Sequence, residues 1–182
     1  MRRTLLPLVV AVALVAPLTQ AQAPVSNKSR IGFVFKQFNV PVEGQFSAFK
    51  GDITFDPAKP EAGHVDLTLD INSLHLPSKE ATGEARKKEW FNAAGFPTAR
   101  FVSTQIKSLG GGRYQADGKL TIKGITRDAS APLTLREEGP LRIADGALTI
   151  RRLDFNIGEG SWRDTDTVAN DVQIKFRVAL PK

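Results

Sequence analysis

Apolar and polar residues alternate over most of this chain, which is the pattern of β-strands with one dry face. The clearest case is residues 64–74, where Val65, Leu67 and Leu69 share one face and Asp66 lies on the other. Eight such segments are separated mostly by short turns, without a sustained helical period between them, so antiparallel pairing is expected. The predicted strands are residues 28–37, 42–55, 64–74, 98–108, 113–123, 126–136, 148–157 and 171–180.

The seventh segment changes phase along its length. Leu148 and Ile150 fall on one face, whereas Leu153 falls on the other. One extra residue in a strand exchanges its two faces, so a β-bulge is predicted at Arg151 and Arg152.

Residues 87–101 interrupt the alternation and carry four aromatic side chains. Helix-forming residues dominate positions 84–92, which predicts one or two turns of helix there, between the third and fourth strands. We expect Phe91 and Phe96 to face the interior and the two lysines that open the stretch to face water.

Eight antiparallel strands, each with one apolar face, form either a sandwich or a closed barrel. A small eight-stranded barrel is filled by its own side chains or holds one small ligand. The residues alone therefore predict an all-β protein whose interior is apolar, and they leave open whether that interior is packed or hollow.

The first 23 residues are predicted to be a secretory signal peptide. They begin with two arginines, continue through an apolar run at 5–18 and end with the small residues Ala21 and Ala23, the expected three-part layout. Cleavage after about Ala23 leaves a single domain, residues 24–182, exported to the periplasm. Elsewhere, no apolar run reaches the ~20 residues that cross a bilayer.

Composition narrows the chemistry further. Cysteine is absent, which excludes thiol catalysis, thiolate metal sites and c-type haem attachment. The 25 basic and 19 acidic residues are spread without a block of one sign, so a nucleic-acid partner is not expected. Oligomeric state is left open, because edge pairing between barrels would allow a homodimer.

The titratable residues do not assemble into a recognisable reactive site. His64 and His75 are the only histidines, and their odd spacing puts them on opposite faces of a regular strand. The acidic residues at 159–171 lack the spacing of a calcium loop and are better explained as turn caps. Neither a Gly-x-Ser-x-Gly elbow nor a phosphate-binding loop is present. No catalytic residue, metal site or cofactor is therefore predicted.

Several short blocks, in their order and spacing, carry a resemblance to a known family. They are SRIGF at 29–33, VEGQF at 42–46, GDITFDP at 51–57, EWFN at 89–92, FPTARF at 96–101 and GKLTIKGIT at 118–126. The chain from about residue 29 to 180 resembles the YceI-like family. The block around Trp162, residues 157–171, looks like one branch of that family, which puts the length of the ligand and its head group in doubt.

This resemblance implies an elongated, lipocalin-like eight-stranded antiparallel barrel around a tunnel. It also implies a binding or carrier protein for a long apolar molecule: a polyisoprenoid, an isoprenoid quinone or a fatty-amide-like lipid. The alternatives are a stress-related or lipid-modifying enzyme of the cell envelope, and a structural barrel without a ligand. The candidate ligand-binding residues are Phe33, Phe35, Val65, Leu67, Leu69, Phe91, Phe96, Phe101, Leu120, Ile122, Ile174 and Phe176.

Overall fold

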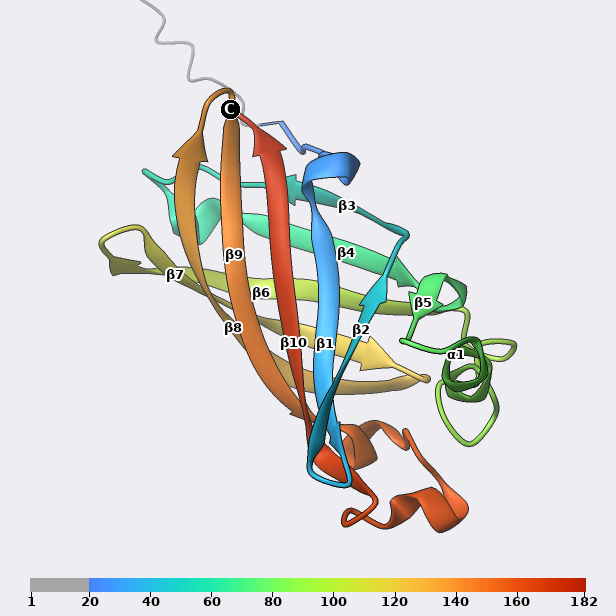
Figure 1. The fold of residues 1–182 in the computed structure, drawn as a ribbon. Coiled ribbons are helices and arrows are strands. Elements are labelled where there is room, and N and C mark those ends of the chain that lie inside the picture. The colour runs from blue at the N-terminus through green and yellow to red at the C-terminus, as the bar shows by residue number, and fades with distance from the viewer. Residues whose placement is uncertain (1–19) are drawn as a thin grey trace, which may run out of the picture.

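The computed structural model describes residues 20–182, which form one curled antiparallel sheet with a short helix beside it (Figure 1). The predicted signal peptide, residues 1–23, lies almost wholly outside the described residues. The strands are β1 (Arg30–Gln37), β2 (Val40–Phe46), β3 (Phe49–Thr54), β4 (His64–Asp70), β5 (Leu74–His75), β6 (Thr98–Gly110), β7 (Arg113–Ile122), β8 (Ile125–Glu138), β9 (Leu141–Arg151) and β10 (Val168–Pro181). The helical elements are α1 (Lys79–Ala85) and the 3-10 turns η1 (Ser26–Lys28), η2 (Pro60–Ala62), η3 (Ile71–Ser73), η4 (Arg152–Phe155) and η5 (Gly160–Arg163).

The strand order is β3-β4-β6-β7-β8-β9-β10-β1-β2-β5, and each strand pairs with its neighbours in antiparallel fashion. Only Ser47 and Ala48 separate β2 from β3. The two strands are therefore halves of one bent strand, the first half paired with β1 and the second with β4. This bent strand joins the two ends of the sheet and turns the curled sheet into a barrel.

The corner between β2 and β3 is held by one buried hydroxyl. Ser73, in η3, accepts the N–H of Ala48 at 3.0 Å, and its own hydroxyl lies 2.7 Å from the carbonyl oxygen of Asp70, to which it donates. The N–H of Ser47 donates to the carbonyl of Ser73 at 3.1 Å. These bonds satisfy backbone groups that leave the sheet ladder where the strand bends.

The predicted all-β, lipocalin-like antiparallel barrel is confirmed as a class, although its strand count differs. Ten strands replace the eight predicted ones because the segment at 42–55 is split by the corner and the segment at 64–74 ends in η3 and the short β5. The physical reason is the same in both places: a barrel of this curvature needs a sharp bend, and a bend interrupts the ladder.

The β-bulge predicted at Arg151 and Arg152 is wrong. Strand β9 ends at Arg151, and the chain enters the 3-10 turn η4, which Asn156 terminates in the left-handed conformation at φ 52°. The change of phase in the sequence therefore marks the end of a strand. Local alternation does not distinguish these two causes.

The helix also lies earlier in the chain than the predicted 84–92. It begins after Ser78, whose side chain accepts the N–H of Ala81 at 3.0 Å and so pairs one of the free donors of the first turn. It ends at Ala85, and residues 86–97 are mostly turns. Its place between the third and fourth predicted strands is confirmed.

One end of the barrel contains a small buried hydrophobic cluster. Its members are Ile53, Val178 and Leu180. Beside it Gln22 and Ile53 exchange two backbone hydrogen bonds of 2.8 and 2.9 Å, which cover part of the outer edge of β3. Gln22 precedes the predicted cleavage point after Ala23, so cleavage at that point would remove this pair.

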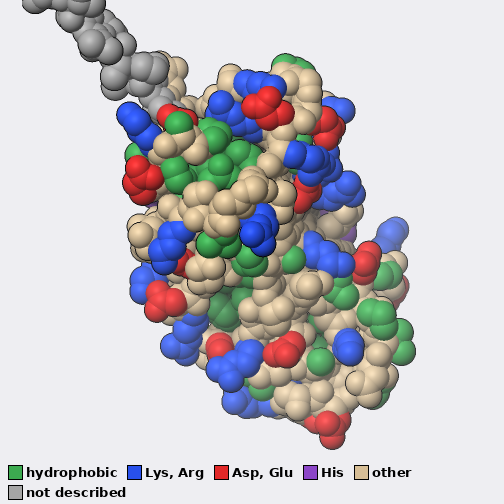
Figure 2. All heavy atoms as spheres, turned by 90° about the vertical axis from the view of Figure 1, so that its left-hand side faces the viewer, with side chains coloured by type: hydrophobic (Ala, Val, Ile, Leu, Met, Phe, Trp, Pro, Cys, Tyr) green, Lys and Arg blue, Asp and Glu red, His purple; other side chains and the backbone are tan. Residues whose placement is uncertain are grey.

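The outer face of the sheet is polar, and Figure 2 shows basic and acidic side chains interspersed over one side of it. Asp117 accepts hydrogen bonds there from Ser130 at 2.6 Å, Gln115 at 2.7 Å and Lys107 at 3.0 Å. These bonds, led by that of Ser130, lower the pKa of the Asp117 carboxyl to about 2. Within residues 20–182, no helix has the length and apolar character needed to cross a membrane.

The depressed pKa of Asp117 predicts a specific loss of stability in acid. Its contribution is present above the unfolded-state pKa of about 3.9 and is lost as the pH falls through about 2. Ser130→Ala should raise the pKa of Asp117 toward its usual value and reduce this contribution, as measured by NMR titration and urea unfolding between pH 5 and 2. Thr104→Ala is the control, because Thr104 bonds only to the backbone carbonyl of Asp117; an equal change in both variants would contradict the assignment.

Candidate functional site

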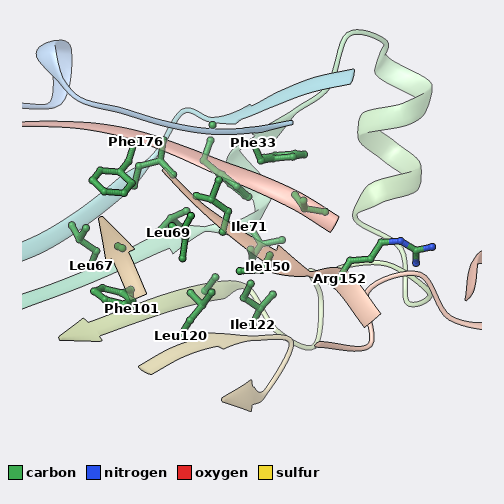
Figure 3. Close-up of a pocket in the computed structure, with 18 of the residues that line it drawn as sticks. Phe33, Leu67, Leu69, Ile71, Phe101, Leu120, Ile122, Ile150, Arg152 and Phe176 are labelled. Carbon is green, nitrogen blue, oxygen red and sulfur yellow. The ribbon is translucent and has the colours of Figure 1, made fainter. Parts of the chain in front are cut away.

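The barrel encloses an apolar cavity of about 340 Å³ that runs along its length. This volume lies within the range typical of small-molecule sites. Its walls are the inward faces of nine of the ten strands, together with residues of η3, η4, η5, α1 and the loop that follows α1. Figure 3 shows rings and branched aliphatic side chains converging on the cavity from several strands.

The structure brings eleven of the twelve predicted ligand-binding residues to this cavity. Ten of them lie on strands, where alternation located the wall correctly, and Phe91 lies in the loop after α1. Their role in binding stays a prediction. The eleven are Phe33, Phe35, Val65, Leu67, Leu69, Phe91, Phe101, Leu120, Ile122, Ile174 and Phe176.

Phe96 is the exception, and the expectation that it faces inward is wrong. Its side chain is 37 % exposed and is absent from the cavity wall. The ring lies instead against Gly124, where an added Cβ would come within 2.7 Å of it. Phe96 belongs to an irregular loop with no strand phase, so local pattern had no basis for orienting it. Lys87 and Lys88 are exposed, as predicted.

Aromatic rings form a connected row along one wall. Phe33 lies 5.6 Å from Phe46 between ring centroids, and Phe46 lies 6.3 Å from Phe91 in an edge-to-face arrangement. Gly44 makes this row possible, because a Cβ there would be 2.3 Å from the Phe33 ring. Gly146 gives the Phe176 ring the same clearance.

Several wall residues were missed by the sequence reasoning. Strand phase would have found Phe46, Phe55, Leu148 and Ile150, since they alternate with outward-facing neighbours. No local signal identifies the residues contributed by α1, its following loop, η4 and η5. The missed residues that the later argument uses are Gln37, Leu76, Ala81, Glu84, Trp90, Arg152, Trp162 and Val168.

Arg152 is the most deeply buried charged side chain in residues 20–182, with 2 % exposed. All five of its N–H groups donate to backbone carbonyls, those of Ile157, Gly158, Asp164, Val168 and Ala169, at 2.7 to 3.4 Å. Burial lowers its pKa from the usual value, with a smaller effect from nearby Arg163. Arg152 therefore fixes the loop from η4 to β10 and has no donor left for a ligand.

Two tryptophans stand beside Arg152 at this end of the cavity. Its guanidinium carbon lies 5.7 Å from the centroid of the Trp90 ring, a cation–π distance. The Trp90 ring is in turn 5.3 Å from the ring of Trp162. Figure 3 shows the guanidinium group of Arg152 directed away from the rings and aliphatic side chains of the cavity.

From the partial exposure of the lining residues there, we infer an opening of the cavity at the end near α1 and η5. Gln37, Leu76, Ala81, Glu84 and Trp162 line it there while remaining partly exposed. We call this group the mouth. The carboxylate of Glu84 is engaged by Lys87 at 2.6 Å. Trp90 also lines the cavity, and its indole N–H is buried without a hydrogen-bond partner within the described residues. The rest of the interior surface is mostly hydrocarbon.

The described residues offer little for catalysis or metal binding. No three His, Cys, Asp or Glu side chains within 20–182 are grouped as a metal site would require. Asp164 caps its own turn by accepting from the N–H of Asp166 and the hydroxyl of Thr167. Ser47 and His75 lie within 3.3 Å, but both are exposed and outside the cavity wall.

Comparison with known proteins gives one family. The model of the YceI-like domain matches residues 24–180. A UPF0312 protein of Pseudomonas savastanoi is 32 % identical over 111 residues, which are 61 % of this chain and 55 % of that protein. One of Yersinia pestis is 35 % identical over 96 residues, 53 % and 50 % of the two chains. This chain thus spans about half the length of the curated relatives it matches.

Solved structures share the fold. BcnA of Burkholderia cenocepacia is 42 % identical with a TM-score of 0.83, covering 86 % of this chain and 98 % of BcnA. The YceI protein of Campylobacter jejuni is 21 % identical, with a TM-score of 0.68 and coverage of 76 % and 84 %. A polyisoprenoid binding domain from Saccharophagus degradans is 16 % identical, with a TM-score of 0.71 and coverage of 89 % and 98 %. The last two likenesses concern the fold alone.

Removal of the Arg152 side chain is predicted to destabilise the fold strongly. Arg152→Met keeps the aliphatic length but leaves five carbonyls without their donor, which should lower the free energy of unfolding by ~3 kcal/mol or more. Arg152→Lys should recover only part of this loss, because an ammonium has three donors and no planar fork. Urea unfolding measures both.

Arg151→Met is the matched control. Arg151 is exposed and pairs with Asp154 at 2.9 Å on the surface, so its loss should cost about 0.5 kcal/mol or less. Equal unfolding free energies for the two methionine variants would contradict the structural role of Arg152.

Proposed function

Since this chain belongs to the YceI-like family, we propose that it is a periplasmic protein that binds and carries a long-chain apolar molecule in its cavity. The family and its neighbours suggest a binding protein rather than an enzyme. The ligand classes that fit are a polyisoprenoid, an isoprenoid quinone or a fatty-amide-like lipid.

The observation that carries this proposal is the chemical uniformity of the cavity. Its wall is built from aromatic, branched aliphatic and alanine side chains of many strands. The buried cation among its lining residues, Arg152, has all of its donors bound to backbone carbonyls. A ligand inside would therefore gain most of its binding free energy by leaving water, with the unpartnered indole N–H of Trp90 as the buried donor on the wall.

This kind of site favours a chain over a compact polar molecule. Each CH₂ group moved from water into an apolar cavity contributes about 0.8 kcal/mol, so affinity grows with tail length without any specific polar contact. The head group is placed at the mouth, where Gln37 and Glu84 are the polar lining residues. The polyisoprenoid binding described for the Saccharophagus degradans domain supports the same ligand class.

The periplasmic location rests on the predicted signal peptide. A carrier in that compartment would shield a water-insoluble tail between two membranes. Fractionation of the host cell tests this part separately, with the mature protein expected in the periplasmic fraction and its amino terminus close to Ala23.

The ligand is tested by native mass spectrometry of the protein purified from its own host without detergent. A co-purified apolar molecule, released in organic solvent and identified by its fragment masses, is the expected result. An unliganded protein that also takes up no polyisoprenoid, quinone or fatty amide from detergent micelles would refute the carrier function and leave the structural barrel.

A bulky substitution in the cavity wall should block binding without unfolding the barrel. Leu69→Trp adds volume to the cavity, which should reduce ligand occupancy at least ~tenfold while changing the free energy of unfolding by ~1–3 kcal/mol. Thr68→Trp, on the opposite face of β4, is the matched control and should bind as the wild type does. Occupancy is measured by mass spectrometry, and unchanged occupancy in Leu69→Trp would place the ligand outside this cavity.

A further inference from the structure

The tip of the β1–β2 hairpin presents apolar side chains to water. Phe38 is 67 % exposed and Val40 is 61 % exposed, the two highest values among the large hydrophobic residues of 20–182. Asn39 lies between them. We call residues 38–40 the hairpin tip.

The backbone of the hairpin tip makes the phenylalanine more unusual. Phe38 and Asn39 both have positive φ, 50° and 63°, as the two central residues of a type I′ turn require. Asparagine and glycine adopt this conformation readily, whereas a bulky side chain is strained in it. In the free protein Phe38 is therefore both strained and exposed, and its side chain lies outside the core.

The hairpin tip stands beside the mouth of the cavity. Gln37, which precedes it, lines the cavity, and the N–H of Phe38 donates to the carbonyl of Thr167 at 2.9 Å. The next residue, Val168, also lines the cavity. Figure 1 shows the β1–β2 turn at the same end of the barrel as η4 and η5.

The strand that leaves the hairpin tip has a free edge on the side of α1. Strand β2 pairs with β1 along its whole length, but β5 covers only Gln45 and Phe46 on its other side. Positions 40–44 therefore have no strand partner on that side within the described chain, and the barrel wall is incomplete there. Pro41 lies on this edge and limits its pairing with another strand.

We propose that the hairpin tip inserts into the surface of a lipid bilayer and holds the mouth of the cavity against the membrane. This inference rests on the proposed carrier function, because a tail that passes directly between bilayer and cavity never crosses water. Insertion would bury the Phe38 ring and the Val40 side chain in the interfacial region, where aromatic side chains are favoured. Insertion would account for the exposure of both side chains in the free protein.

The form of the hairpin tip favours a membrane over a protein partner. A stable protein interface buries about 1,000 Å² or more, whereas two side chains at a convex turn offer much less. A bilayer surface adapts to such a projection and needs no matching pocket. Small apolar insertions give weak, reversible membrane binding, which is what repeated loading and release require.

The charges near the hairpin tip indicate how this contact is made. Lys36 and Arg163 are exposed there, but so are Asp164 and Asp166. Because both signs are present, attraction to anionic lipid does not dominate. The contact is apolar and should occur on zwitterionic vesicles with little dependence on salt.

The test is whether the full exported domain floats together with phosphatidylcholine vesicles in a density gradient. The double variant Phe38→Asn/Val40→Thr removes the apolar side chains while keeping residue types suited to the turn and the strand. Wild type should float with the vesicles, and the double variant should lose at least ~tenfold in vesicle affinity. Leu109→Ser is the control, because Leu109 is 50 % exposed at the β6–β7 hairpin and should float as the wild type does.

Two further readouts separate this inference from the proposed function. Uptake of the apolar ligand from detergent micelles depends only on the cavity, so the double variant should match the wild type there. Transfer of the same ligand from vesicles should be slowed in the double variant alone. If the wild type takes up no ligand from micelles, the carrier function fails while flotation still decides the membrane contact.

Four outcomes would overturn the membrane contact. Wild type that does not float, or a double variant that floats equally well, would remove the role of the hairpin tip. Binding restricted to phosphatidylglycerol vesicles and abolished by salt would assign it to surface charge. A concentration-dependent dimer in sedimentation analysis, lost in the double variant without any change in flotation, would assign the hairpin tip to contact with a second copy of the chain.

Discussion

The barrel depends on the corner at which one long strand leaves β1 and joins β4. Without that bend the two ends of the sheet would not be brought together, and its apolar face would meet water. The buried hydroxyl of Ser73 sits at the bend, accepting the N–H of Ala48 at 3.0 Å and lying 2.7 Å from the carbonyl oxygen of Asp70. These hydrogen bonds pair backbone groups that have no partner in the sheet at the bend. The strand can therefore bend there and enclose the apolar interior.

The two ends of the barrel are built from different elements, so the two ends of the cavity are not equivalent. At one end Ile53, Val178 and Leu180 pack together. At the other, the connection from β9 to β10 is held open as a loop by the five hydrogen bonds of Arg152. The guanidinium N–H groups of Arg152 are all bound to backbone carbonyls of this loop. They therefore stabilise the loop beside the mouth and do not add free polar groups to the cavity.

This division between structural polarity and an apolar interior agrees with a carrier of long tails. The described cavity wall is mostly hydrocarbon. Selectivity in such a site comes from the length and shape of the tail together with whatever meets the head group at the mouth. In the proposed membrane contact, the exposed hairpin tip beside that mouth would bring the cavity to the bilayer, where such lipids reside.

Alternation with a period of two is a local property of the chain, so the strands, their antiparallel class and ten of the wall residues could be predicted from the sequence alone. Phe96 and Arg152 escaped it, since each takes its place from groups far away in sequence: Phe96 from the turn at Gly124 and Arg152 from carbonyls up to 17 residues later. Closure of the sheet at Ser47 and Ala48, the hollow interior and the position of the mouth were likewise decided only by the tertiary structure. They follow from how curved strands meet in space, and a pattern read along one strand holds no information about its curvature.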